Sequence, residues 1–400
     1  MLTGALMVCA ALFSACLPSA EVSSVAAGHS EQELLYECPF NNGFYATIIG
    51  NNTTRDSKIC HACESDLCVP GFQSPMPIRA VMQPGKAPLV VLLLGCQGNT
   101  NDPVPKLWMR WLSEAGFHVL TFNSSLSSAF IKASGRGVAG NIYNEAECSR
   151  DIIGAYLKLP DVQERVTKVG VVGMSYGGIQ ALLIGQMVAE KKVDYQIHSI
   201  RAFSPPIDMM QSAKLIDRWW REDRWNYTLP QMYLLVAKHK PIIPGGKIPL
   251  SDSMMRAGVA ASFRLPFAEI VDVSDSTYNL KILPTQDSLE EKVVREDYAA
   301  SYGFSRFMLQ CTFPYWKDKL GISNFGQLNS VARLTNVLPH QPEFTQAFIA
   351  CDDPLNRPED LEVLKQCTTC NHLQILNGGG HLGFVNDSWT RTKLENIFKN

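Results

Sequence analysis

Residues 168–190 read KVGVVGMSYGGIQALLIGQMVAE, and this stretch decides the fold. An apolar run leads into Gly173-Met174-Ser175-Tyr176-Gly177, and a helical run follows it. Between a strand and a helix, a G-x-S-x-G pattern predicts a sharp turn that holds the serine hydroxyl clear of a sheet. The start of the helix favours developing negative charge. We therefore predict that Ser175 is a nucleophile; the alternative is a glycine-rich turn without chemistry.

Apolar runs and helical stretches alternate on both sides of this turn. The pattern predicts an α/β fold with a mostly parallel central sheet flanked by helices. Residues 87–94, APLVVLLL, are apolar throughout, as expected of a strand buried on both faces. We expect strands at 78–82, 87–94, 117–122, 168–172, 200–203, 343–350 and 373–376, and helices at 107–114, 145–159 and 179–190.

The alternation is lost in the middle of the chain and weak at its start. Residues 205–340 contain several Trp, Met and Phe residues without a β/α pattern, so we interpret them as an inserted cap. Residues 17–75 form a Cys-rich N-terminal extension, in which 45–49 are predicted as a strand. The core of the predicted α/β fold would then comprise residues 76–204 and 341–400, after a signal peptide at 1–16.

A serine nucleophile needs a base and an acid. His381 follows the predicted strand at 373–376 in Asn-Gly-Gly-Gly-His, where the glycines leave room for a substrate. His372 is the competing base, although its place at a strand edge favours a structural role. The loop after 343–350 offers two acids, Asp352 and Asp353. The order nucleophile, acid, base is one that serine hydrolases use.

An acyl-transfer site also needs donors for an oxyanion. The backbone N–H of Tyr176, directly after the nucleophile, is one candidate. The second should come from Gly95-Cys96-Gln97-Gly98, after the strand at 87–94, and by position we favour the N–H of Cys96. Cys96 could at the same time be a disulfide partner or a buried thiol.

Several motifs together resemble one family. They are Arg136-Gly137-Val138-Ala139-Gly140, the G-x-S-x-G-G element, Ser204-Pro205-Pro206-Ile207-Asp208, Asp352-Asp353-Pro354 and Gly379-Gly380-His381-Leu382-Gly383-Phe384. They resemble the α/β-hydrolase superfamily, and most closely its YheT-like, medium-chain-esterase branch, over about residues 80–205 and 345–390. The resemblance implies an α/β-hydrolase fold and a catalytic triad of Ser175, Asp353 and His381. Asp353 takes the acid's place in the turn, and Asp352 would brace the loop.

The N-terminus and the cysteines predict export. Residues 4–13, GALMVCAALF, are apolar and too short to span a bilayer, as in a secretory signal. Phe13-Ser14-Ala15-Cys16 resembles a lipobox, so lipidation of Cys16 would attach the protein to a membrane; the alternative is an ordinary signal peptide. Ten further cysteines suit disulfides. Cys60/Cys63 and Cys367/Cys370 could instead bind zinc.

The composition excludes one function class. The formal net charge is −2, with 46% hydrophobic and 18% charged residues, so no basic excess is available for a nucleic acid. We expect a serine hydrolase of small-molecule or lipid carboxylic esters, an esterase or lipase, that needs no metal or organic cofactor. The alternatives are a peptidase or amidase on the same fold and a non-catalytic surface binding protein.

Overall fold

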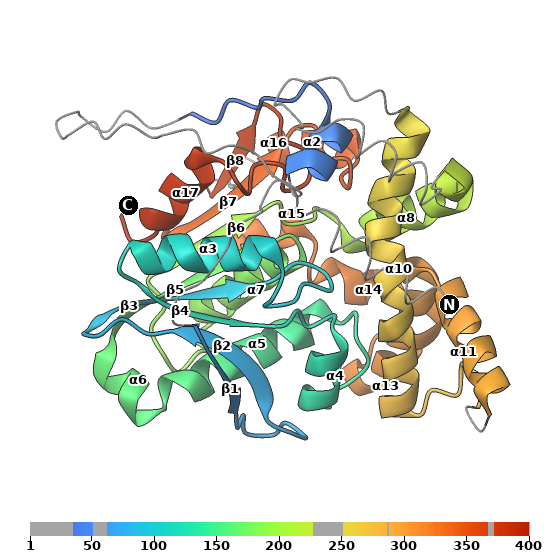
Figure 1. The fold of residues 1–400 in the computed structure, drawn as a ribbon, viewed down its shortest axis with the longest axis horizontal. Coiled ribbons are helices and arrows are strands. Elements are labelled where there is room, and N and C mark those ends of the chain that lie inside the picture. Colours follow the sequence, from blue (N-terminus) through green and yellow to red (C-terminus); the bar gives the residue numbers. More distant parts are fainter. Residues whose placement is uncertain (1–34, 51–61, 227–250, 286–287, 367–371, 400) are drawn as a thin grey trace.

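The computed structural model describes residues 35–50, 62–226, 251–285, 288–366 and 372–399, and contains an eight-stranded sheet (Figure 1). The strand order is β1-β2-β4-β3-β5-β6-β7-β8. Pairs β1/β2 and β2/β4 are antiparallel and the other five pairs are parallel. The predicted α/β-hydrolase fold is thereby confirmed. The strands are β1 (Cys63–Leu67), β2 (Met76–Val81), β3 (Ala87–Leu93), β4 (His118–Phe122), β5 (Val166–Met174), β6 (Ser199–Phe203), β7 (Thr345–Ala350) and β8 (Leu373–Leu376).

Helices cover both faces of the sheet (Figure 1). α3 (Pro103–Glu114) and α17 (Ser388–Glu395) lie on one face, and α5 (Ile142–Leu157) and α7 (Tyr176–Ala189) on the other. α7 is buried on every side from Tyr176 to Gly185, which explains why its sequence is apolar without helical periodicity. The shorter helices of the core are α4 (Ser128–Ser134), α6 (Pro160–Arg165) and α16 (Pro358–Lys365).

In its described residues, the chain between β6 and β7 forms helices joined by turns and loops and contains no strand. The longest of these helices, α10, packs against both α8 and α11 at one end of the molecule (Figure 1). This is the part of the sequence interpreted as a cap. Its elements are α8 (Met209–Asp223), η1 (Arg224–Asn226), α10 (Asp252–Tyr278), α11 (Leu289–Ser301), α12 (Phe304–Phe307), η2 (Met308–Thr312), α13 (Phe313–Leu320), α14 (Phe325–Ser330), α15 (Leu334–Val337) and η3 (Leu338–His340).

The extension contributes to the fold in two places. β1 forms the antiparallel edge of the sheet, and α2 (Gly43–Gly50) packs near the C-terminal part of the chain. The strand predicted at residues 45–49 is wrong, because these residues are helical. The Thr47 hydroxyl donates to the Gly43 carbonyl one turn back, 2.6 Å away. Packing of this helix outweighs the strand preference of its β-branched residues.

No disulfide is formed among the described residues. All seven cysteines in the described residues are free thiols; they are Cys38, Cys63, Cys68, Cys96, Cys148, Cys311 and Cys351. Cys60, Cys367 and Cys370 lie outside the described residues, as does the predicted signal peptide with Cys16. Within the described chain, no group of three or more His, Cys, Asp or Glu side chains could hold a metal ion. The described cysteines therefore support neither the predicted disulfides nor the alternative zinc site.

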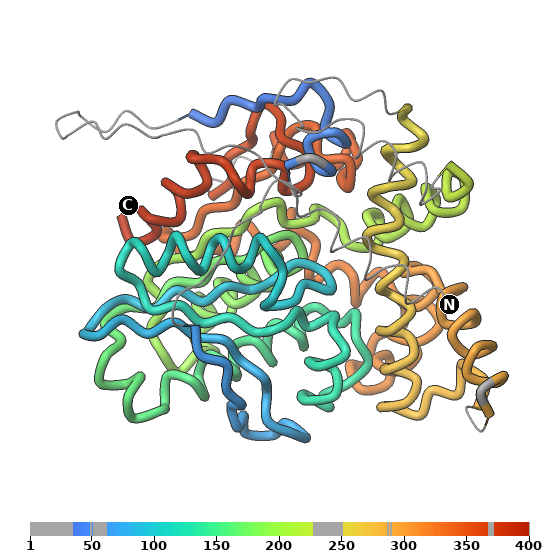
Figure 2. Tube along the Cα trace, viewed as in Figure 1, coloured from blue at the N-terminus to red at the C-terminus, as the bar shows by residue number. Residues whose placement is uncertain are grey.

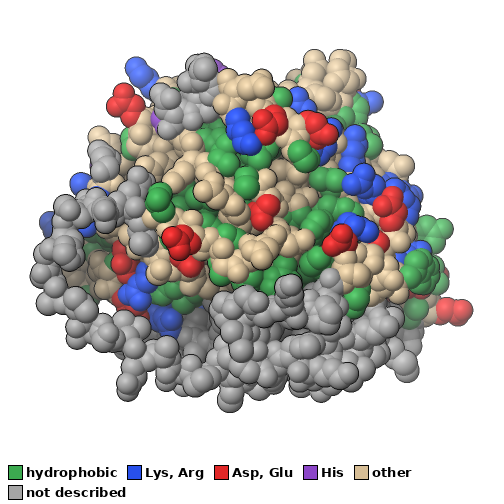
Figure 3. Space-filling view, turned by 90° about the horizontal axis from the view of Figure 1, so that it is seen from above, with side chains coloured by type: hydrophobic (Ala, Val, Ile, Leu, Met, Phe, Trp, Pro, Cys, Tyr) green, Lys and Arg blue, Asp and Glu red, His purple; other side chains and the backbone are tan. Residues whose placement is uncertain are grey.

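Two properties of the described residues bear on membranes and charged partners. None of the helices in these residues combines the length and the apolar content needed to cross a bilayer. On the face that Figure 3 shows, basic and acidic side chains are interspersed rather than gathered by sign.

Candidate active site

Ser175 lies at the turn between β5 and α7, in the backbone conformation that the G-x-S-x-G pattern predicts. Its φ is 52° and its ψ is −118°, a region that non-glycine residues rarely adopt. A Cβ on Gly173 would lie 2.1 Å from the Gly177 carbonyl oxygen, and a Cβ on Gly177 would lie 2.2 Å from that of Leu93. Both glycines are therefore required by close backbone contact. With glycine at both positions, Ser175 can adopt its strained backbone conformation at the carboxyl end of β5.

His381 and Asp353 meet Ser175 in a line of hydrogen bonds. The Nε2 atom of His381 is 2.8 Å from the Oγ of Ser175, and its Nδ1 atom is 2.8 Å from the Oδ2 of Asp353. The side chains of His381 and Asp353 are only 4% and 1% exposed. An ionised carboxylate only accepts hydrogen bonds, so Nδ1 carries the imidazole proton. The Nε2 lone pair then faces the serine hydroxyl, as a general base requires.

The structure separates the two candidate acids. Asp353 is buried, and its second oxygen accepts the backbone N–H of Leu355 at 2.9 Å. Asp352 is half-buried and accepts the N–H of Gly380, next to His381, at 2.8 Å. Asp353 therefore contacts the imidazole and Asp352 holds the backbone of the same loop. His372, the competing base, lies beside the start of β7, with its Nδ1 atom 3.1 Å from the Thr345 carbonyl oxygen.

The loop after β3 lies against Ser175. A Cβ on Gly95 would be 3.4 Å from the Cβ of Ser175, and Cys96 lines the same cavity as Ser175 and Tyr176. In the described residues, neither Cys96 nor Tyr176 donates its N–H to another backbone carbonyl. Cys96 and Tyr176 thus line the same cavity as Ser175, and their role as oxyanion donors stays a prediction.

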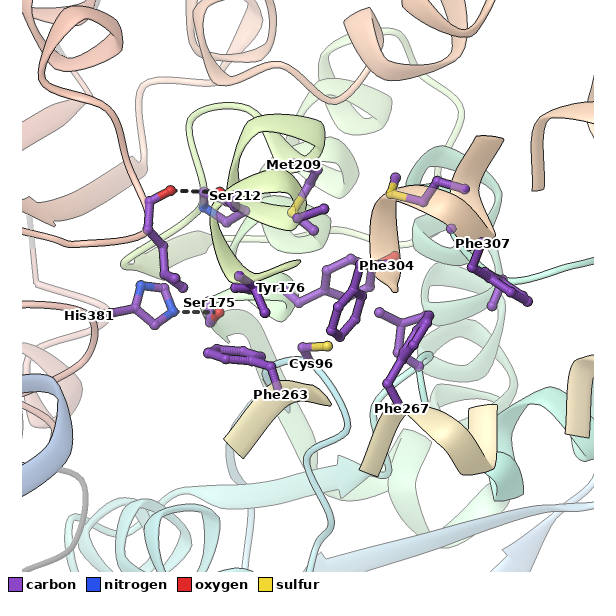
Figure 4. Close-up of a pocket in the computed structure, with 18 residues that line it drawn as sticks. Cys96, Ser175, Tyr176, Met209, Ser212, Phe263, Phe267, Phe304, Phe307 and His381 are labelled. Atoms are coloured by element: carbon purple, nitrogen blue, oxygen red, sulfur yellow. Dashed lines mark hydrogen bonds between the residues drawn. The ribbon is translucent and has the colours of Figure 1, made fainter. Parts of the chain in front are cut away.

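A small apolar cavity opens from Ser175 toward the helices between β6 and β7. It has a volume of about 50 Å³. Figure 4 shows His381 beside Ser175 at one end, and Phe267, Phe304 and Phe307 at the other. The rings of Phe267 and Phe304 stack with centroids 3.8 Å apart. The wall opposite the triad is therefore aromatic, and it comes from the segment interpreted as a cap.

Glu145 is a buried carboxyl beneath the nucleophile that the sequence reasoning missed. It accepts three hydrogen bonds, from the Tyr176 hydroxyl at 2.7 Å, the Ser125 hydroxyl at 2.6 Å and the Gly140 N–H at 2.6 Å. Burial raises the pKa of this carboxyl, and the three donors partly offset that rise. Glu145 ties the residue after the nucleophile to the R-G-V-A-G loop. The sequence signal that could have identified Glu145 is an acidic residue on the buried face of α5, the helix after the R-G-V-A-G motif.

The R-G-V-A-G motif joins the core to the segment after β6. The Trp316 indole donates to the Val138 carbonyl at 2.8 Å, and the Thr312 hydroxyl donates to the Ala139 carbonyl at 2.6 Å. A Cβ on Gly137, whose φ is +134°, would lie 2.3 Å from the Trp316 ring. The motif therefore serves as a backbone docking point for the aromatic helices above the cavity.

Comparison with known proteins finds similar overall structures but no match in sequence. No family model matches, and no curated protein matches in sequence. Similar solved structures include the esterase Pf2001 of Pyrococcus furiosus, with a TM-score of 0.45 and 13% identity over 84% of this chain and 90% of that one. The α/β hydrolase GrgF of Penicillium sp. sh18 has a TM-score of 0.46 and 13% identity over 84% and 98%. A bacterial membrane phospholipase A has a TM-score of 0.43 and 13% sequence identity, and the match covers 88% of this chain and 89% of that one. These likenesses concern the overall structure, at 13% sequence identity.

Proposed function

We propose that this chain is a serine hydrolase that cleaves carboxylic esters through an acyl-enzyme on Ser175. The observation that carries the proposal is the hydrogen-bonded line from Ser175 through His381 to Asp353, at 2.8 Å for each link, facing an apolar cavity. A buried imidazole between a hydroxyl and a carboxylate can take a proton from one side while the other side holds its orientation. Neither a metal nor an organic cofactor is part of this mechanism.

Acylation would begin when the Oγ of Ser175 bonds to the substrate carbonyl carbon and its proton passes to the Nε2 of His381. The carbonyl oxygen becomes an oxyanion, and the N–H groups of Cys96 and Tyr176 are the proposed donors to it. The bond from that carbon to the alcohol oxygen then breaks. The departing alkoxide takes the proton from Nε2, and the acyl group stays on Ser175.

Deacylation repeats the same steps with water. His381 takes a proton from a water molecule as its oxygen bonds to the acyl carbon. The second tetrahedral intermediate collapses, the bond to Ser175 breaks, and the serine recovers its proton from Nε2. The products are a carboxylic acid and an alcohol, and the site returns to its first state.

The cavity lining supports an apolar acyl group as the substrate's acid part. Apart from Ser175, Ser212 and His381, nearly all of the lining side chains are aliphatic, aromatic or thioether groups. An apolar wall binds a hydrocarbon chain through the area it removes from water. No Asp, Glu, Lys or Arg side chain is among the described lining residues, so none of these is present to recognise a charged peptide side chain. The lining therefore suits an apolar acid part, and the choice of ester over amide is the part of the proposal that the substrate comparison below tests.

A fluorophosphonate probe tests the nucleophile. We expect the probe to label the wild-type protein at Ser175, located by mass spectrometry, and to leave Ser175→Ala unlabelled. p-Nitrophenyl esters of graded chain length and matching p-nitroanilides then compare ester with amide turnover. Faster anilide cleavage would favour the peptidase or amidase. A protein with neither labelling nor turnover would be a binding module.

Export and lipidation remain proposals, because residues 1–34 lie outside the described chain. They are supported by the apolar run at 4–13 and by the Cys16 that follows small residues. The mass of the mature N-terminus tests both. Diacylglycerol on Cys16 would establish membrane attachment, and a chain that keeps Met1 would exclude export by this signal.

A further inference from the structure

The N-terminal segment lies directly on the loop that carries His381. Figure 2 shows the tube of residues 35–50 running alongside the C-terminal part of the chain, at the opposite end of the sequence. Thr47, on α2, is buried, and its hydroxyl oxygen accepts the backbone N–H of His381 at 2.8 Å. The same hydroxyl donates its proton to the Gly43 carbonyl at 2.6 Å. The two bonds fix the hydroxyl's direction, so it can only act as an acceptor toward His381.

The two backbones touch through glycines. A Cβ on Gly380, whose φ is +58°, would lie 2.0 Å from the Gly43 carbonyl oxygen and 2.6 Å from the Thr47 hydroxyl. A Cβ on Gly43 would lie 1.8 Å from the Asp352 carbonyl oxygen. No side chain fits at either place without a backbone shift. The glycines beside His381 therefore serve the contact with α2 as well as the turn of the loop.

The other side of α2 contacts the helices between β6 and β7. The ring of Phe44 packs edge to face on Trp219 of α8, with centroids 5.1 Å apart. The Cδ1 atom of Ile48 is 3.7 Å from where a Cβ on Gly258 of α10 would lie. α2 is thus held between the cap segment and the histidine loop, which limits the freedom of its Thr47.

We propose that α2 is part of the active site and that Thr47 is a positioning residue for His381. Because the Thr47 hydroxyl accepts the backbone N–H of His381, it fixes the position of the histidine backbone. This keeps the imidazole Nε2 at the 2.8 Å from the Ser175 Oγ that the structure shows. Small displacements of a general base lower the rate of proton transfer without weakening substrate binding. The inference rests on the proposed hydrolase function.

The test compares Thr47→Val, which keeps the β-branched shape but has no acceptor, with Thr47→Ser, which keeps the hydroxyl. We expect Thr47→Val to lower kcat for a p-nitrophenyl ester by roughly 10- to 100-fold with little change in KM, since a buried N–H loses its partner. The second-order rate of fluorophosphonate labelling at Ser175 should fall similarly. Thr47→Ser should restore both to within about threefold of the wild type.

Thr390→Val is the matched control. The buried Thr390 hydroxyl donates to the Phe384 carbonyl at 2.7 Å, in the same region but with no bond to His381. It should lower the thermal midpoint and leave kcat unchanged. Thr47→Ala, which suits a helix, serves where Thr47→Val does not fold. Labelling is measured well below the thermal midpoint of each variant, where unfolded molecules contribute little to the observed rate.

Three outcomes would overturn the inference. They are wild-type kcat and labelling rate in folded Thr47→Val or Thr47→Ala, a failure of Thr47→Ser to restore the rates, and a failure of both nonpolar variants to fold. The last would assign α2 to the fold rather than to positioning. Failure of the proposed function is distinguishable, because wild-type protein would then show neither ester turnover nor labelling at Ser175.

Discussion

Replacing Asp353 and Asp352 by asparagine, one at a time, separates the acid that contacts the imidazole from the acid that holds its loop. Asp353→Asn places an amide where the Oδ2 atom is 2.8 Å from the Nδ1 of His381. The amide nitrogen donates to Nδ1 and moves the imidazole proton to Nε2, where it blocks removal of the serine proton. The amide oxygen can still accept the Leu355 N–H at the place of Oδ1, so the loop should keep its fold.

The expected magnitudes differ widely. An Asp-to-Asn change in a Ser-His-Asp triad lowers kcat by about 10⁴, or about 5.4 kcal/mol in activation free energy. Asp352 is 2.8 Å from the Gly380 N–H, and an asparagine oxygen can replace that acceptor. The difference between a charge-assisted and a neutral hydrogen bond is about 1 kcal/mol, so Asp352→Asn should lower kcat by roughly tenfold or less.

Steady-state kinetics on a p-nitrophenyl ester measure both effects, with circular dichroism and thermal midpoints to check folding. Fluorophosphonate labelling rates should follow the same order, because they too require proton removal from Ser175. If Asp352→Asn loses activity by thousands-fold while Asp353→Asn retains most of it, the geometric assignment of the acid is refuted. Equal losses in the two variants would show that the loop acts as a unit.

Three further predictions concern pH, packing and the cavity. Burial lowers the pKa of His118 below 6.5, and its Nδ1 atom accepts the Gln83 N–H at 2.9 Å, so the folded protein holds the neutral ring. The unfolded chain then binds the proton more readily, so the free energy of unfolding should fall as pH drops below about 6.5. Denaturant titrations at pH 8 and 5.5 should show a smaller fall for His118→Asn than for the wild type. An equal fall in the two proteins would contradict this prediction. Gly177→Ala would put a Cβ 2.2 Å from the Leu93 carbonyl oxygen. The free energy of unfolding, measured by urea titration, should fall by about 3 kcal/mol. A fall of less than about 0.5 kcal/mol would mean that the turn is not tightly packed. Met209→Ala removes a half-buried side chain from the cavity wall and should raise the ratio of kcat/KM for octanoyl over butyryl esters by roughly tenfold. An unchanged ratio would place the acyl chain elsewhere.

Local patterns in the sequence carried much of the prediction. The apolar run before Ser175 and the helix after it specify a strand, a turn and a helix within some twenty residues, because close glycine contacts and backbone strain are set by neighbours in the chain. Strand β3 was predicted because burial on both faces of a parallel sheet leaves a continuous apolar run, and the other strands followed from their alternation with helical stretches. Ser175, His381 and Asp353 were selected as each follows such a strand.

Contacts between distant residues were decided only by the tertiary structure. Residues 45–49 carry strand-favouring side chains, yet they form a helix because α2 packs between the cap segment and the histidine loop. Glu145 looked like an ordinary helix residue until folding enclosed it under Tyr176. Thr47 and His381 are 334 positions apart in the chain, and no local pattern encodes a hydrogen bond across that separation. The sequence itself gives the chemical type of each residue and the local hydrophobic period. Which buried donor bonds to which acceptor depends on how segments that are distant in the chain pack against each other in the fold.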